Sequence, residues 1–376
     1  MGQLPTVEDV ARVASVSRQT VSNVLNSPHI VKQATRARVE EAIAQLGYRQ
    51  NASARRLRTQ KSATIGIRLD PMRNGISGSI LDRFLHALTE HADARGMRVL
   101  LFTAEDPDGE IAQIRRLRDG SDVDAFVLTS TFHGDPRTQW LIDNRVPFVT
   151  FGRPWGIDDM NDPKHLWVDV DGAAGGRAAT NHLLDGGARR IVHLGWPSPS
   201  GTGDDRRRGW EDAMRERTGA TSDELAALTI TAEEGVAQAM AAVSALLADG
   251  VRPDGMVCAS DSLALGAMMA ATSAGLAGLP IVGFDNTPVA AAVGLSSVEQ
   301  SLGDVAAGAL ELLMGRTGSD LIGGELTPGE AHRLVTPVLV VRTPNRLPLF
   351  DSTTESTISA VGNVAADTHS ERKNHE

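Results

Sequence analysis

From about Ala63 onward, short apolar segments alternate with longer segments of helical character. The apolar segments read SATIGIRL, MRVLLF, DAFVLTS, PFVTF, RIVHL, DGMVCAS and LPIVGF, and Ser79 to Arg95 places apolar side chains at helical spacing. Such an alternation predicts a parallel sheet covered by helices on both faces. About ten strands exceed one compact sheet. We therefore expect an α/β chain with two doubly wound parallel-sheet subdomains, divided near the segment GRPWGIDDMNDPK.

Charge is distributed unevenly along the chain. Residues 1–61 contain ten Lys and Arg and four Asp and Glu, whereas the remaining 315 residues contain 27 basic and 43 acidic side chains; the formal net charge is −10. A basic segment on an acidic body indicates that only the first 61 residues contact a polyanion.

Residues 6–26, TVEDVARVASVSRQTVSNVLN, predict two short helices across a tight turn. Thr6 and Ser17 are the expected N-caps. The apolar stripe of the first helix is formed by Val7, Val10, Ala11 and Ala14. The second helix directs outward the polar residues Arg18, Gln19, Thr20, Ser22 and Asn23. This is the helix-turn-helix pattern that lays a recognition helix in the major groove, where Gln and Asn pair with adenine and Arg with guanine.

A third helix is expected from Thr35, as its cap, to Leu46, ending at Gly47. The next segment, NASARRLRTQKS, contains Leu57 as its only large apolar side chain, among three arginines. Arginines with one apolar wedge are what a minor-groove binder needs. A basic solvated linker is the alternative interpretation of this segment.

Residues 6–60 resemble the DNA-binding head of the lactose-repressor (LacI/GalR) family, through TVEDVARVASVSRQTVSNVLN, TRARVEEAIAQLGYRQN and the hinge NASARRL. The resemblance implies that Arg18 and Gln19 read base edges and that Leu57 intercalates. Ser15 departs from the pattern, because many members have Gly in this turn, and a left-handed non-glycine residue costs about 1 kcal/mol. The expected DNA-binding residues are Thr6, Ser17, Arg18, Gln19, Thr20, Ser22, Asn23, Asn51, Ala54, Arg55 and Leu57.

Polar residues follow the predicted strands of the acidic body. Ligands of open α/β sheets bind beyond the carboxyl ends of the strands. Alternating carboxylates and arginines there suit a polyhydroxylated ligand, and a flat tryptophan ring covers the apolar face of a sugar. Taken singly, an Asp or Ser after a strand is more often a helix cap. The expected effector-binding residues are Asp70, Asn74, Arg153, Trp155, Asp171, Trp196, Arg206, Ser260, Asp261 and Asp285.

The family resemblance extends over about residues 5–342. It also indicates which of the expected effector-binding residues contact the effector in the family. DDRRRGW resembles the segment with an effector-binding arginine, which implies Arg206; IVGFDNTP implies Asp285, and ASDSLALGAM implies Ser260 or Asp261. WVDVDGAAGGRAATNHL suggests Asp171. The first loop, LDPMRNGIS, departs from the family pattern, so the effector's identity cannot be carried over there.

The domain boundaries follow from these patterns. We expect a DNA-binding domain at 1–49, a hinge helix at 50–61, and an effector-binding and dimerisation core at 62–345 that resembles a periplasmic sugar-binding protein. Its subdomains are expected to combine 62–160 with 296–330, and 165–292 with 331–345. A disordered tail is expected at 346–376, whose polar composition lacks a leucine heptad and so favours a homodimer over a tetramer.

These features together predict a repressor of carbohydrate-utilisation genes, released from a palindromic operator by a mono- or oligosaccharide. No signal peptide or long apolar run is present, and the lone Cys258 fits a reducing compartment, so a cytoplasmic protein without membrane contact is expected. We expect no cofactor, no metal and no catalysis, because the P-loop, G-x-S-x-G, H-E-x-x-H and G-x-G-x-x-G motifs are missing. The alternatives are an architectural DNA-bending protein and a sugar sensor that does not bind DNA.

Overall fold

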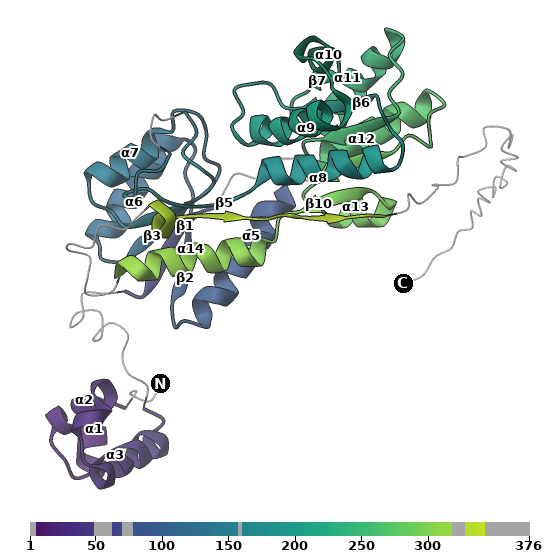
Figure 1. Cartoon of the computed structure of the whole chain (residues 1–376). Helices are drawn as coiled ribbons and strands as arrows, with labels where there is room; N and C mark the ends of the chain where they lie inside the picture. The colour runs from purple at the N-terminus through teal and green to yellow at the C-terminus, as the bar shows by residue number, and fades with distance from the viewer. Residues whose placement is uncertain (1–4, 49–61, 70–77, 157–159, 318–327, 343–376) are drawn as a thin grey trace, which may run out of the picture.

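The computed structural model describes residues 5–48, 62–69, 78–156, 160–317 and 328–342. Figure 1 shows a small N-terminal helical domain and two α/β lobes. Several predicted features lie outside the described residues: the tail, the hinge helix and the site residues Asn51, Ala54, Arg55, Leu57, Asp70 and Asn74.

Three α-helices form the N-terminal domain: α1 (Val7–Val13), α2 (Arg18–Asn26) and α3 (Gln33–Leu46), with a short 3-10 helix, η1 (Pro28–Ile30), before α3. Val10, Val21 and Val39 are fully buried, so the predicted apolar stripes do form the core. The helix α3 ends at Gly47 in the left-handed conformation, as predicted. Thr35, however, is not its cap: the helix begins at Gln33, and the Thr35 N–H bonds to the Lys32 carbonyl within the first turn.

The first lobe is built on a six-stranded sheet. Its strands are β1 (Thr64–Arg68), β2 (Arg98–Phe102), β3 (Ala125–Leu128), β4 (Phe148–Phe151), β5 (Leu166–Val170) and β11 (His332–Val335), in the order β11-β5-β4-β3-β1-β2 with parallel pairing. The helices are α5 (Gly78–Asp93), α6 (Pro107–Asp119), α7 (Pro136–Asp143) and α14 (Leu302–Thr317). One core contains Phe84 and Leu310, and a second contains Ile114 and Phe126. Helices therefore cover both faces.

The second lobe repeats this design. Its strands are β6 (Ile191–Gly195), β7 (Thr229–Thr231), β8 (Gly255–Cys258), β9 (Ile281–Phe284), β10 (Ser296–Glu299) and β12 (Val338–Val340), in the order β12-β10-β9-β8-β6-β7. Only β12 is antiparallel to its neighbour among the described pairs. The helices are α8 (Gly172–Asp185), α9 (Thr202–Thr218), α10 (Ser222–Ala227), α11 (Val236–Ala248), α12 (Asp261–Ser273) and α13 (Pro288–Val293), and the short α15 (Pro328–Ala331) precedes β11. Cys258 lies in this lobe's core.

The chain crosses between the lobes after β5, after β10 and after β11 (Figure 1). The expected subdomain boundaries are wrong at three strands, because each of them lies before the strand and the chain crosses after it. Leu166–Val170 and His332–Val335 pair within the first sheet, and Ser296–Glu299 pairs within the second. The loop around GRPWGIDDMNDPK joins two strands of one sheet, so its composition marks a loop and not a lobe boundary.

Both sheets have one topological switch point, where the chain order of the strands reverses. It lies between β1 and β3 in the first sheet and between β6 and β8 in the second. Loops at the carboxyl ends of strands around such a point form the usual ligand site of open α/β sheets. The second lobe's switch point is where the most deeply buried polar residues of the predicted site gather.

Candidate effector-binding site and DNA-binding surface

The helix α2 presents the predicted recognition surface. Arg18 and Gln19 are exposed at its N-terminal end, and Gln19 Nε2 donates to Asn23 Oδ1 at 3.0 Å one turn further on. Arg18 also forms an ion pair with Glu8 of α1, at 3.2 Å, in which both side chains are exposed. A long polar face at the start of a helix is what base reading in the major groove requires.

Thr6 and Ser17 have structural roles in this domain. The Thr6 hydroxyl accepts from the Asp9 backbone N–H at 3.3 Å in a capping box, and Ser17 Oγ accepts from the Thr20 N–H at 3.1 Å. Ser15, in the turn between α1 and α2, has a φ of 53°. This value confirms that a non-glycine residue occupies the left-handed region in this turn. DNA contacts by Thr6 and Ser17 stay predictions.

Arg206 is the centre of the candidate effector site. It lies in the first turns of α9 and is buried, with its guanidinium carbon 3.7 Å from the Phe284 ring centre and 5.3 Å from that of Trp196. Its Nη1 donates to the Ala259 carbonyl at the end of β8, while its Nε, also buried, has no hydrogen-bond partner. A buried donor without a partner is costly, so this atom is available to an acceptor on a ligand.

Two helical glycines allow Arg206 to lie so deep. A Cβ on Gly176 of α8 would be 2.2 Å from the Arg206 carbonyl oxygen, and a Cβ on Gly209 of α9 would be 1.9 Å from the Ala173 carbonyl oxygen. Backbone carbonyls cannot yield by that much, so larger residues would force the helices apart. The segment WVDVDGAAGGRAATNHL therefore positions the site through helix packing as well as through its polar residues.

Asp285 follows β9 and lies beside Arg206. Its Oδ1 is 3.6 Å from Arg206 Nη1 and accepts from Gln300 Nε2 at 2.5 Å. Burial raises the pKa of Asp285 to about 7, although the charge of Arg206 opposes the shift. Burial also lowers the pKa of Arg206, against the attraction of Asp285. Desolvation thus exceeds mutual attraction for both partners, because the pair is too far apart for a direct hydrogen bond.

Arg153 and Trp155 belong to the loop after β4 and contact the second lobe. Arg153 Nε donates to Asp169 Oδ2 at 2.8 Å, and its Nη2 bonds to Asp205 at the start of α9. Its guanidinium lies 4.5 Å from the centre of the Trp155 ring. That ring packs so closely on Gly201 that a Cβ there would lie 2.5 Å from it, and the buried indole N–H lacks a hydrogen-bond partner. A second donor is thus available where the lobes meet.

Trp196 and Ser260 are joined by Glu234, a residue that no sequence pattern indicates. Trp196 Nε1 and Ser260 Oγ each donate to Glu234 Oε2 at 2.8 Å. Glu234 follows β7, a strand of three residues too short to be recognised as an apolar run. Asp169 could not be predicted for a different reason. It lies inside β5 and contributes to the site only because Arg153, in the loop after the neighbouring strand β4, contacts it.

Asp171 and Asp261 take structural positions. Asp171 caps α8 by accepting from the Ala174 N–H at 2.8 Å. Asp261 is buried and accepts from the Thr287 N–H at 2.7 Å, from the Thr287 hydroxyl, and from the Ser297 hydroxyl at 2.6 Å. Both of its oxygens are therefore engaged by the protein. An effector contact by either residue stays a prediction.

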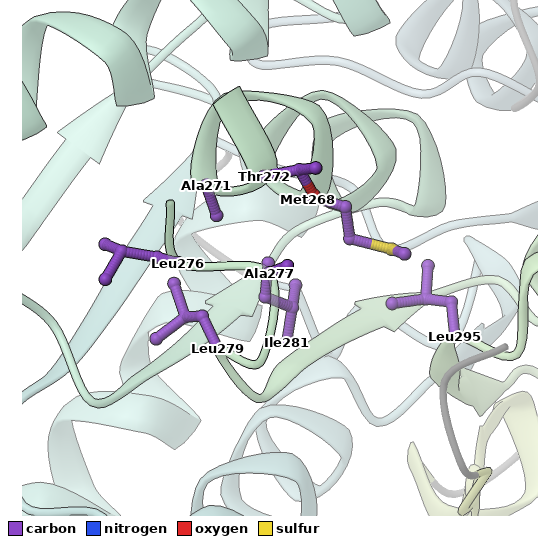
Figure 2. Close-up of a pocket in the computed structure, with 8 residues that line it drawn as sticks. All are labelled: Met268, Ala271, Thr272, Leu276, Ala277, Leu279, Ile281 and Leu295. Carbon is purple, nitrogen blue, oxygen red and sulfur yellow. The ribbon is translucent and has the colours of Figure 1, made fainter. Parts of the chain in front are cut away.

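A small apolar pocket lies elsewhere in the second lobe. Met268 and Thr272 of α12 face Leu295 and Ile281 across it, as Figure 2 shows. Its volume is about 40 Å³, close to the volume of one water molecule in the liquid. None of the predicted effector-binding residues lines this pocket. In the part of the chain that the structure describes, no three His, Cys, Asp or Glu side chains form a metal-binding group, and no helix is long and apolar enough to cross a bilayer.

These features define a class of protein: a helix-turn-helix domain followed by a two-lobed α/β core with a buried polar cluster where the lobes meet. Residues 6–51 match the bacterial regulatory proteins of the lacI family, and residues 180–343 match the periplasmic binding protein-like domain. The chain belongs to the lacI family of bacterial regulatory proteins, which confirms the resemblance seen in the sequence. The family consists of DNA-binding transcription regulators and not of enzymes.

Individual relatives support this assignment along most of the chain. The HTH-type transcriptional regulator AglR of Rhizobium meliloti is 32% identical over 91% of this chain and 96% of its own length. The regulator CelR of Thermobifida fusca is 32% identical over 76% of this chain and 83% of its own. A solved CelR–cellobiose complex, 27% identical, superposes with a TM-score of 0.65 over 91% of this chain and all of the other.

Proposed function

We propose that this protein is a transcription repressor that binds a pseudo-palindromic operator as a homodimer and is released by a small sugar. One observation carries the effector assignment. Arg206 lies buried against the Trp196 and Phe284 rings, and the buried Asp285 carboxylate lies beside its guanidinium. A guanidinium and a carboxylate beside flat apolar rings match the hydroxyl groups and the apolar face of a sugar. The solved CelR–cellobiose complex, a structural relative, supports this ligand class.

The operator assignment rests on α2 and on family membership. Two recognition helices of a dimer would occupy successive major grooves, and the hinge residues, including Leu57, would enter the minor groove between them. An architectural protein would bend any A·T-rich DNA without a ligand, and a sugar sensor would not bind DNA. Selection of bound sequences from a random DNA library separates these functions, because a two-fold symmetric consensus is expected only for the repressor.

Gln19→Ala tests base reading by α2. We expect a loss of roughly 1–3 kcal/mol of discrimination at one base position of each half-site, because an adenine contact would be removed. Competition binding with operator variants measures this. Gln45→Ala, on the exposed face of α3 in the same domain, is the control and should leave discrimination unchanged. Equal weakening of Gln19→Ala on every DNA would show that Gln19 contacts only phosphate.

Arg206→Ala tests the effector site. We expect this variant to keep its operator affinity while sugars no longer release it, because the buried guanidinium would be the main donor to the ligand. Thermal-shift screening against mono- and disaccharides, followed by operator titration, measures both effects. Arg207→Ala is the control, since Arg207 is the next residue on α9 but pairs with Asp204 and Glu211 at the surface. A normal sugar response in Arg206→Ala would remove Arg206 from the site.

The homodimer and the cellular location are parts of the same proposal. We assign the subunit contact to the second lobe, where Met269 of α12 and Val289 of α13 are apolar side chains exposed by 45% and 36%. A regulator of this family would act in the cytoplasm, at the nucleoid when bound to its operator.

A further inference from the structure

The helix α5 of the first lobe contacts the turn of the second lobe that carries Asp285. Arg83 Nη1 donates to the carbonyl oxygens of Asp285, at 3.1 Å, and of Asn286, at 3.3 Å. Its Nη2 donates to Glu299 Oε1 at 2.8 Å. One guanidinium therefore joins a helix of one lobe to the main chain of the candidate effector site in the other.

The turn that Arg83 holds has an unfavourable backbone conformation. Asp285 and Asn286 are consecutive non-glycine residues with φ angles of 110° and 47°. Non-glycine residues rarely adopt such φ angles, and they persist there only when surrounding contacts fix them. Within the second lobe, the Asn286 N–H donates to Ser297 Oγ at 2.9 Å, and Asn286 Nδ2 donates to Glu299 Oε2 at 2.7 Å. Arg83 adds a donor for the two carbonyl oxygens.

We propose that Arg83, together with Glu299, is a latch through which the separation of the lobes sets the position of the Asp285 carboxylate. With the lobes together, Arg83 fixes both carbonyl groups of the turn and Asp285 faces Arg206. Separation of the lobes releases the carbonyls, and the turn relaxes. Occupancy of the site and lobe orientation are then coupled in both directions. The proposal rests on the proposed function only in naming Asp285 as an effector contact.

The arrangement requires the geometry of an arginine. A guanidinium presents several N–H groups in a rigid fork, whereas a lysine ammonium acts as a single point charge. Glu299 divides its two oxygens between Arg83 and Asn286, so it links the latch to the turn a second time. A second polar contact between the lobes, Arg153 with Asp205, joins side chains only and does not involve the Asp285 turn.

The latch can be tested on the full-length protein without an effector or DNA. Arg83→Met removes all three contacts, and Arg189→Met is a matched control, because Arg189 Nη1 donates to the carbonyls of Leu184, at 3.0 Å, and Ala188, at 2.7 Å, within one lobe. Hydrogen exchange of residues 285–287 should become roughly tenfold faster in Arg83→Met, the effect of losing one charge-assisted hydrogen bond. Arg189→Met should exchange there as the unsubstituted protein does.

Lobe separation is measured in the same variants with spin labels at Thr89→Cys on α5 and Ser273→Cys on α12, both at exposed positions. The native Cys258 is buried and will not compete for the label. Arg83→Met should broaden the distance distribution and move it to longer distances, and Arg189→Met should not. Arg83→Lys and Glu299→Gln keep part of the contacts, so intermediate changes are expected; these variants also serve if Arg83→Met does not fold.

The latch would be overturned if Arg83→Met and Arg83→Lys showed the same spin-label distances as the unsubstituted protein and the same hydrogen-exchange rates at residues 285–287. Faster exchange throughout both lobes in the two Met variants would also overturn it, because it would reflect a general loss of stability. The two proposals fail separately. Lobes that separate in Arg83→Met, in a protein that responds to no sugar, would refute the sugar effector and support the latch. If the protein responds to a sugar and the distances in Arg83→Met are unchanged, the sugar effector is supported and the latch is refuted.

Discussion

At the scale of single residues, Asp285 couples the stability of the second lobe to pH. Burial raises its pKa from the ordinary 3.8 to about 7, so the folded protein takes up a proton that the unfolded chain releases. The contribution of Asp285 to the free energy of unfolding therefore falls as pH rises from about 4 to about 7. Asp285→Asn cannot titrate. We expect the free energy of unfolding of the unsubstituted protein, relative to Asp285→Asn, to decrease by up to about 1.4 kcal/mol per pH unit in that window.

Denaturant unfolding at several pH values measures this difference, and Asp204→Asn is the control. Burial of Asp204 raises its pKa, but hydrogen bonds from the Ser198 hydroxyl and the Ser200 N–H outweigh it, so its pKa is lowered overall. A lowered pKa gives a pH dependence of the opposite sign. The Asp204 carboxylate stabilises the folded protein at neutral pH, and this contribution is lost only as pH falls below about 4. The same pH dependence in both variants would show that burial does not set the protonation of Asp285.

Ser15 shows how a residue can be assigned a conformation from sequence alone. The turn between α1 and α2 is so short that one residue must adopt a left-handed φ, and the family resemblance indicates which one. The observed φ of 53° agrees. The pairing of Gln19 with Asn23 could not be predicted in the same way, because it depends on the rotamers of two exposed side chains.

At the scale of elements, the contact between α8 and α9 determines where Arg206 lies. Gly176→Ala would place a methyl group 2.2 Å from the Arg206 carbonyl oxygen, so the helices must separate. We expect a loss of about 1–3 kcal/mol in the free energy of unfolding of the second lobe and weaker sugar binding, because overpacking moves the backbone. Calorimetry and sugar titration measure the two effects.

Gly315→Ala provides the control for Gly176→Ala. Gly315 also lies in a helix, α14, and nothing lies within 4 Å of the position of its Cβ. Alanine there should stabilise the helix by roughly 0.5–1 kcal/mol. If Gly176→Ala were equally stabilising, close approach of α8 and α9 would not be needed to position Arg206.

The elements also show what the sequence could and could not predict. Buried strands are apolar on both faces, so most strands, and the parallel pairing of both sheets apart from β12, follow from the order of residues. The sequence does not predict to which lobe β5, β10 and β11 belong, because a strand can pair with strands that are distant in sequence. Asp171 and Asp261 match the pattern of ligand-binding residues at strand ends, but a carboxylate there also caps helices, and only the contacts show which role it has.

At the scale of the whole molecule, the proposed function requires two copies of the chain. A single head would read one half-site, whereas a dimer reads two and gains avidity of roughly 10²- to 10⁴-fold. The acidic body would be repelled by DNA, so operator contact falls to the basic first 61 residues of each copy. The body is then left to join the two copies, and we infer that an apolar surface such as the one around Met269 does so.

Met269→Glu tests whether α12 supplies that surface. A carboxylate in an apolar subunit contact is desolvated without a partner, so the variant should be monomeric at concentrations where the unsubstituted protein is dimeric. Sedimentation measures this, and operator affinity should fall roughly 10²- to 10⁴-fold as avidity is lost. Met160→Glu is the control: Met160 is also exposed, at 38%, but lies in the first lobe, where its carbonyl accepts from the Trp167 indole. A Met269→Glu variant that stays dimeric and binds the operator normally would place the subunit contact elsewhere on the body.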